Sequence, residues 1–118
     1  MTPSKENYLK TILRIKRTKK CVRAVDIALE MNVSKPSVSR AIHLLEQENY
    51  ITIDHTRYIS FTTYGLALAV KIEERYHVFY HFLLSLGAPE DVTALDAGRL
   101  EHAISNESFT LLQKRISD

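Results

Sequence analysis

The sequence has few of the residues that disulfide-stapled, linker-rich or membrane-spanning proteins depend on. Its single cysteine, Cys21, excludes an internal disulfide and fits a reducing, cytoplasmic location. Three glycines and three prolines are too few for long flexible linkers. The most apolar stretch, residues 66–86, is interrupted by charged residues at 71 and 73–75, so we expect no membrane span. A polar stretch follows Met1 directly, and we therefore expect no signal peptide.

Sequence patterns typical of enzymes are also missing. The chain has no glycine-rich loop that would cradle a phosphate, no pair of zinc-binding cysteines and no convincing setting for a nucleophile. Its 118 residues, 45% hydrophobic and 25% charged, are ordinary for a compact globular protein. The composition therefore favours a binding protein over an enzyme.

The two halves of the chain differ in charge, although the net charge is only +2. Residues 1–60 carry 11 Lys and Arg against 6 Asp and Glu, whereas residues 61–118 carry 5 against 8. A basic half joined to a mildly acidic half indicates that the N-terminal half meets a polyanion.

Residues 1–48 show the pattern of a helix followed by a helix-turn-helix. Thr2 and Pro3 suit the start of a first helix that ends in the basic loop 17–20. A second helix is expected over 24–31, and Asn32 tolerates the left-handed conformation that the turn 31–34 requires. Val33 is expected to fill the space between the two helices. Ser34 then caps a third helix with Pro36 in its first turn.

The third helix has two different faces, as a recognition helix requires. Its apolar positions follow the spacing of a core face: Val38, Ala41, Ile42 and Leu45. The opposite face is polar and free to enter a major groove. We expect DNA contacts from its residues Ser34, Lys35, Pro36, Ser37, Ser39, Arg40 and His43.

Two short alternating runs, 50–53 and 58–61, predict a β-hairpin whose tip 54–57 is a wing. His55, Arg57 and Tyr58 of this wing are expected to contact the DNA backbone or the minor groove. Phosphate contacts by charge are expected from Lys19, Lys20 and Arg23.

A long helix should begin at Thr62 or Thr63 and run to about Leu86, ended by Gly87. Its second half is apolar on nearly every side, which predicts that a second subunit covers it. Two shorter helices, about 89–104 and 105–116, complete the predicted homodimerisation region. The residues expected at the dimer interface are Val78, Phe79, Phe82, Leu83 and Leu86.

The fold class expected is mainly α, with a winged helix-turn-helix DNA-binding domain over 1–62 and a helical dimerisation domain over 63–118. Several stretches of this pattern resemble the diphtheria toxin repressor and manganese transport regulator family of transcription regulators. They are residues 4–12 (SKENYLKTI), 22–28 (VRAVDIA), 36–39 (PSVS), 61–65 (FTTYG) and 100–105 (LEHAIS). The resemblance implies a homodimeric DNA-binding regulator, a repressor, that reads a near-palindromic operator.

The family resemblance also implies a Mn²⁺ or Fe²⁺ site, but most of its ligand positions are replaced in this chain. The replaced positions are Asn7, Lys10, Tyr76, Tyr80 and Gly98. Only Glu101 and His102 keep matching identities, and two ligands fall short of the four to six donors that a divalent cation takes. We therefore expect that the metal switch is lost and that DNA binding needs no Mn²⁺ or Fe²⁺.

Three alternatives remain open from the sequence. His77 and His81 are spaced i, i+4 and, with Glu101 and His102, are candidates for a rebuilt metal site that would take zinc. The second alternative is a regulator of the same fold that senses an organic ligand between the long helices. The third is a winged helix that binds protein instead of DNA.

Overall fold

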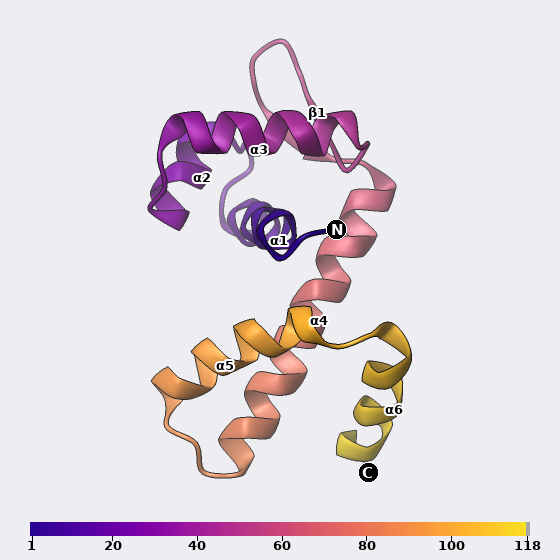
Figure 1. Ribbon diagram of the computed structural model, residues 1–118. Helices are drawn as coiled ribbons and strands as arrows, with labels where there is room; N and C mark the ends of the chain where they lie inside the picture. The colour runs from indigo at the N-terminus through magenta and orange to yellow at the C-terminus, as the bar shows by residue number, and fades with distance from the viewer. Residues whose placement is uncertain (118) are drawn as a thin grey trace. The chain divides into compact units, whose positions relative to one another are not determined.

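The computed structural model describes residues 1–117, which form six helices and one two-stranded antiparallel sheet (Figure 1). This order confirms the predicted fold class, and every element begins and ends close to its predicted position. In chain order the elements are α1 (Pro3–Thr18), α2 (Ala24–Met31), α3 (Lys35–Gln47), β1 (Ile51–Ile53), β2 (Ile59–Phe61), α4 (Thr63–Ser85), α5 (Glu90–Ala103) and α6 (Asn106–Ser117).

The chain folds as two compact units, Met1–Val70 and Lys71–Asp118. The division falls inside α4, whereas the predicted domain boundary lies at the start of that helix. The first turns of α4 therefore complete the N-terminal unit. Within residues 1–117, no helix combines the length and hydrophobicity that crossing a membrane requires.

The core of the N-terminal unit is built from one face of each of its helices and from the sheet. Figure 1 shows α3 running across this unit, with α2 beside it and α1 seen nearly end-on. The fully buried side chains are Leu9 and Ile12 of α1, Val22, Ile27 of α2, Val38 and Leu45 of α3, Ile51 of β1 and Ile59 of β2. The predicted apolar face of α3 is thus confirmed.

The helix ends follow local signals in the sequence. Thr2 caps α1, where its side chain accepts a hydrogen bond from the Lys5 backbone N–H, and Pro3 occupies the first helical position. Asn32 ends α2 in the left-handed region with φ 55° and ψ 50°. The prediction for Val33 is wrong: its side chain is 38% exposed. Ile27 and Val38, both fully buried, fill the interior instead.

The sheet pairs Ile51 with Phe61, Thr52 with Ser60 and Ile53 with Ile59. Directly after β2, the backbone N–H of Thr62 donates to the Tyr50 carbonyl oxygen over 3.1 Å. Thr62 Oγ1 caps α4 by accepting from the Gly65 backbone N–H at 3.0 Å. A Cβ atom added at Gly65 would lie 1.8 Å from the Tyr50 carbonyl oxygen, so only glycine fits at this junction.

The C-terminal unit has a small core in which Phe79, Ala97 and Phe109 are buried. Arg75 of α4 lies at the end of α5, where its Nη1 donates to the carbonyl oxygen of Ile104 over 2.7 Å. Its guanidinium also lies 5.2 Å from the centre of the Phe109 ring. A single arginine thus joins all three helices of this unit.

We predict that Gly65→Ala lowers the free energy of unfolding by at least about 2 kcal/mol, because backbone atoms cannot move aside for the methyl group. Gly98 is the matched control, since it lies inside α5 and a Cβ there meets nothing within 4 Å. Gly98→Ala should raise the free energy of unfolding by about 0.5–1 kcal/mol. Thermal melting followed by circular dichroism measures both. Equal shifts for the two variants would contradict this account of Gly65.

Candidate nucleic-acid interface

The third helix, α3, is fixed in the N-terminal unit by a capped start and a buried face. Ser34 is its N-cap, and Ser34 Oγ accepts from the Ser37 backbone N–H at 3.3 Å and lies 2.8 Å from Ser37 Oγ. Val38, Ile42 and Leu45 are buried on one side. This anchoring leaves the other side of the helix held rigidly toward solvent.

The solvent face of α3 carries the side chains predicted to read DNA. Lys35, Pro36, Ser39, Arg40 and His43 are exposed, and Ser37 is half-buried. Arg40 Nη2 lies 3.5 Å from Ser37 Oγ, the limit of a hydrogen bond. Most donors of the guanidinium therefore remain available for a bidentate contact with guanine or a phosphate.

The wing tip is organised around one aspartate. Asp54 Oδ1 accepts from the Thr56 N–H at 2.9 Å, from Thr56 Oγ1 at 2.6 Å and from the Tyr58 N–H at 3.0 Å. The Thr56 hydroxyl, followed by the Tyr58 backbone, holds the pKa of the Asp54 carboxyl below its usual value. This hub fixes a turn in which Arg57 adopts φ 69°, so that both His55 and Arg57 are exposed.

The base of the wing is joined to the basic loop that precedes α2. The Ile59 N–H donates to the Val22 carbonyl oxygen over 2.8 Å. The Arg23 guanidinium lies 4.5 Å from the centre of the Tyr58 ring, a cation–π distance. These contacts bring the predicted phosphate-binding loop and the predicted wing residues together on the N-terminal unit.

The basic loop and the base of the wing enclose a pocket of about 220 Å³. Its lining residues are Lys19, Cys21, Arg23, Val25, Asp26 and Tyr58. Lys19 Nζ lies 2.6 Å from Asp26 Oδ1, and this hydrogen bond lowers the pKa of the Asp26 carboxyl. Asp26 thus offsets part of the charge of Lys19, whereas Lys20 is exposed and the Arg23 guanidinium packs on Tyr58.

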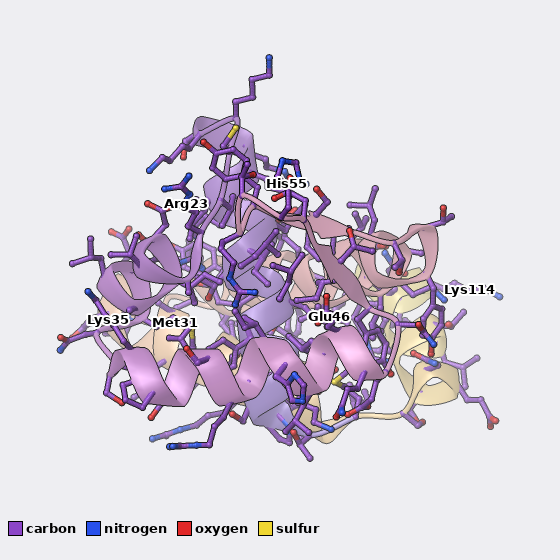
Figure 2. All side chains as sticks on the ribbon, turned by 90° about the horizontal axis from the view of Figure 1, so that it is seen from above. Arg23, Met31, Lys35, Glu46, His55 and Lys114 are labelled. Atoms are coloured by element: carbon purple, nitrogen blue, oxygen red, sulfur yellow. The ribbon has the colours of Figure 1, made fainter. Side chains whose placement is uncertain are left out.

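Two positioning residues were missed by the sequence reasoning. Asp26 also accepts from the Arg23 N–H at 2.9 Å, which fixes the start of α2. Glu46 Oε2 accepts from the Ile53 N–H at 3.2 Å and thereby ties the end of α3 to the wing strand. Figure 2 shows Lys35 and Glu46 toward opposite ends of α3, and Arg23 and His55 on the side of the wing. The role of Asp26 could have been predicted, because a carboxylate three residues after a helix cap often accepts from the backbone N–H of the cap residue. No comparable sequence pattern indicates the role of Glu46.

The metal-ligand candidates of the C-terminal unit lie in two different environments. Glu101 is buried, and His102 Nε2 lies 3.5 Å from Glu101 Oε1. His77 and His81 are exposed on α4, with ring centres 6.2 Å apart. In the part of the chain that the structure describes, no three His, Cys, Asp or Glu side chains are grouped so that they could hold a metal ion.

Tyr76 and Tyr80 occupy α4 positions where the family resemblance implies ligands. Their rings stack at 5.8 Å, and the Tyr80 hydroxyl donates to Glu90 Oε1 over 3.2 Å. Partial burial and the Glu90 carboxylate raise the pKa of Tyr80 above its usual value, which keeps its phenol protonated and a poor ligand. Within this unit, these donors do not fit a Mn²⁺ or Fe²⁺ ion.

The predicted dimer-interface residues differ in exposure. Leu86 is 68% exposed, and Val78, Phe82 and Leu83 are half-buried. Phe79 is 5% exposed, with its ring centre 5.8 Å from that of Phe109. Phe79 therefore differs from the other residues expected at the dimer interface, because its side chain belongs to the core of its own unit.

Comparison with known proteins places these features in a family. Residues 1–59 match the family model described as "Iron dependent repressor, N-terminal DNA binding domain". The chain is 30% identical over 104 residues to the transcriptional regulator MntR of Escherichia coli O6:H1, covering 88% of this chain and 67% of that protein. It is 29% identical over 108 residues to the regulator MntR of Listeria welshimeri, covering 92% of this chain and 76% of that protein.

Solved structures give the same result. The fold is similar to that of the manganese regulator SloR, with a TM-score of 0.84, 31% identity and coverage of 99% of this chain and 55% of that one. It is also similar to the metal-dependent transcriptional regulator MtsR, with a TM-score of 0.90, 29% identity and the same coverage. The chain thus spans about half the length of these two solved structures.

Proposed function

This chain belongs to the iron dependent repressor family, a family of transcription regulators and not of enzymes, and from this premise we propose how it acts. It is a sequence-specific DNA-binding regulator, a repressor, that works in the cytoplasm. Its DNA-contacting surface consists of α3, the wing and the basic loop before α2. The residues assigned to that surface are Ser34, Lys35, Pro36, Ser37, Ser39, Arg40, His43, His55, Arg57, Tyr58, Lys19, Lys20 and Arg23.

The observation that carries this proposal is the two-faced α3. Its apolar side is anchored by three buried residues, and its polar side is exposed over more than two turns. A helix held in this way can insert into the major groove without rearranging the core. Arg40 lies in the middle of the exposed side, where its fork of donors suits the O6 and N7 atoms of guanine.

The wing and the basic loop add contacts that do not depend on sequence. Arg23, packed against Tyr58, and the exposed Arg57 place two guanidinium groups on the same unit as α3. Such groups bind phosphates by charge, and every phosphate neutralised makes the affinity fall more steeply with salt. In this proposal α3 contacts the bases and determines sequence specificity, whereas the wing and the basic loop contact phosphates and position the protein on the duplex.

We predict that Arg40→Ala weakens binding to an operator fragment by about 1–3 kcal/mol at fixed salt, because a bidentate contact is lost. Fluorescence anisotropy with the operator and with a scrambled duplex measures the effect on both sequences. Arg115→Ala, which removes an exposed cation from the C-terminal unit, is the matched control and should bind as the wild type does. An unchanged affinity of Arg40→Ala for the operator would remove Arg40 from the residues proposed to contact the bases. Failure of the wild type to bind any promoter duplex would favour the protein-binding alternative.

The regulator acts as a homodimer through the second half of α4 and the two C-terminal helices. This region leaves Leu86 exposed and Val78, Phe82 and Leu83 half-buried, so apolar side chains of α4 and of the residue after it remain for a second subunit to cover. A two-fold dimer carries two copies of α3, so the operator is a near-palindrome with half-sites about one helical turn apart or a multiple of it.

Phe82→Glu tests the dimer, because a carboxylate in a subunit interface is desolvated without a partner. We predict a shift from dimer to monomer in light scattering at micromolar concentration, together with weaker operator binding. Leu29→Glu places the same charge at a residue that is 78% exposed on α2 and should leave the mass unchanged. A monomeric wild type at that concentration would rule out the proposed interface.

The metal switch of the family is lost in this chain. Tyr80 is engaged with Glu90, Tyr76 stacks on Tyr80, and the N-terminal helix offers Asn7 and Lys10 where the resemblance implies ligands. With a cation and neutral groups in place of carboxylates and imidazole, the DNA-binding form is held by packing and hydrogen bonding instead of by Mn²⁺ or Fe²⁺.

We predict that operator affinity after chelator treatment changes by less than about threefold, under 0.7 kcal/mol, when Mn²⁺ or Fe²⁺ is restored. Anisotropy titrations with each metal at constant ionic strength make the measurement. The Tyr76→His variant, which restores an imidazole at one implied ligand position, shows whether a single donor is enough to bring the response back. A rise of tenfold or more in the wild type would refute the lost switch.

A further inference from the structure

A pocket of about 220 Å³ opens between α4 and α6 within the C-terminal unit. Its lining residues are Lys71, Glu74 and Arg75 of α4 and Asn106, Phe109, Thr110 and Gln113 of α6. None of the residues proposed for the dimer interface is among these described lining residues. The volume is below that of the clefts that hold drug-sized ligands, so the pocket has room for a small molecule only.

Arg75 brings to this pocket a positive charge that neutral groups hold in place. The residue is half-buried, and its Nη1 donates to the carbonyl oxygens of Glu101 over 3.3 Å and of Ile104 over 2.7 Å. A third hydrogen bond joins its Nη2 to Asn106 Oδ1, and the guanidinium lies 5.2 Å from the centre of the Phe109 ring. These contacts fix the position of the charge without neutralising it.

Lys71 adds a second cation one helical turn before Arg75, and therefore on the same face of α4. Among residues 1–117, neither of these two side chains forms an ion pair with a carboxylate. Glu74 also lines the pocket, and its Oε1 accepts from Gln113 Nε2 at 2.8 Å. Two cations and one carboxylate leave one positive charge of the lining unmatched, which a monoanion would neutralise.

Helix α6 supplies neutral hydrogen-bonding groups and an apolar surface. Asn106 and Thr110 are spaced i, i+4, so an amide and a hydroxyl lie together on the face of α6 that lines the pocket. Because Asn106 Oδ1 accepts from Arg75, its Nδ2 remains to donate to a ligand. Asn106 is also the first residue of α6, where the helix dipole favours an anion. The Phe109 ring borders the pocket and gives an apolar surface for the body of a ligand.

We propose that this pocket binds a small organic monocarboxylate. A guanidinium has five N–H donors, and the three hydrogen bonds of Arg75 leave capacity for a further acceptor. Hydrogen bonds from cationic donors to a carboxylate are stronger than those between neutral groups. A dianion fits less well, because the carboxylate of Glu74 repels its second charge. The site does not depend on the proposed DNA-binding function.

Titration of sodium benzoate into the full chain labelled with ¹⁵N, without DNA and at constant ionic strength, tests the pocket by NMR. We expect saturable shifts of the amide resonances of residues 71–75 and 106–113, with a Kd of about 1 mM for so small a ligand. Benzamide, the neutral analogue of the same size, and sodium phosphate should each bind at least about threefold more weakly, since an ion pair near the surface is worth up to about fivefold.

Variants of Lys71 assign the binding to this pocket without disturbing Arg75, which joins the three helices of the unit. Lys71→Gln removes one cation at an exposed position and should weaken benzoate binding about threefold to fivefold, whereas Lys71→Arg keeps the charge and should bind as the wild type does. Lys114→Gln is the matched control, because it removes an exposed cation of α6 that does not line the pocket.

Five outcomes would overturn the proposal. They are an unchanged affinity in Lys71→Gln, an equal loss in Lys114→Gln, equal binding of benzamide, tighter binding of phosphate, and shifts confined to other residues or absent. None of these outcomes bears on operator binding, which is measured separately.

Discussion

No side chain fits at position 65, because a Cβ atom there would meet the carbonyl oxygen of Tyr50 at 1.8 Å. The same carbonyl oxygen accepts from the Thr62 N–H, and the Tyr50 and Tyr64 rings stack at 5.1 Å. These contacts lock the end of the sheet to the first turn of α4. The two strands and α4 meet at this joint. α3 and the loop before α2 are each tied to one of the strands by a hydrogen bond.

The attachments can be followed outward from the joint. Tyr50 leads into β1, and the Ile53 N–H binds Glu46, which fixes the end of α3. β2 returns through Ile59, whose N–H binds Val22 and fixes the loop before α2. The wing strands thus donate both hydrogen bonds from backbone N–H groups: one to the Glu46 side chain at the end of α3 and one to the Val22 backbone in the loop before α2.

The fold was predictable from sequence where local chemistry decides the outcome. Thr2, Asn32 and Ser34 each determine a helix end through their own backbone or side chain, so those ends were predicted closely. The exposure of Val33 and the burial of Phe79 were not predicted. Burial depends on which neighbouring side chains fill the available space, and the apolar character of a residue does not determine this. Glu46 was missed because its partner lies seven residues away on a strand, where no helix or turn rule applies. The exposed polar face of α3 was predictable because helical periodicity separates it from the buried face.

The carboxylate of Asp54 closes the wing tip with three hydrogen bonds made inside the turn. It thereby holds Arg57 at φ 69°, a conformation that a non-glycine residue adopts only when its surroundings impose it. Ordering a backbone residue costs about 1–2 kcal/mol, and here that entropy is lost during folding and not at the moment of contact with a partner. In the proposed DNA-binding function the tip therefore meets a duplex as a rigid body, so encounter needs no loop closure and its rate is set by diffusion, orientation and charge.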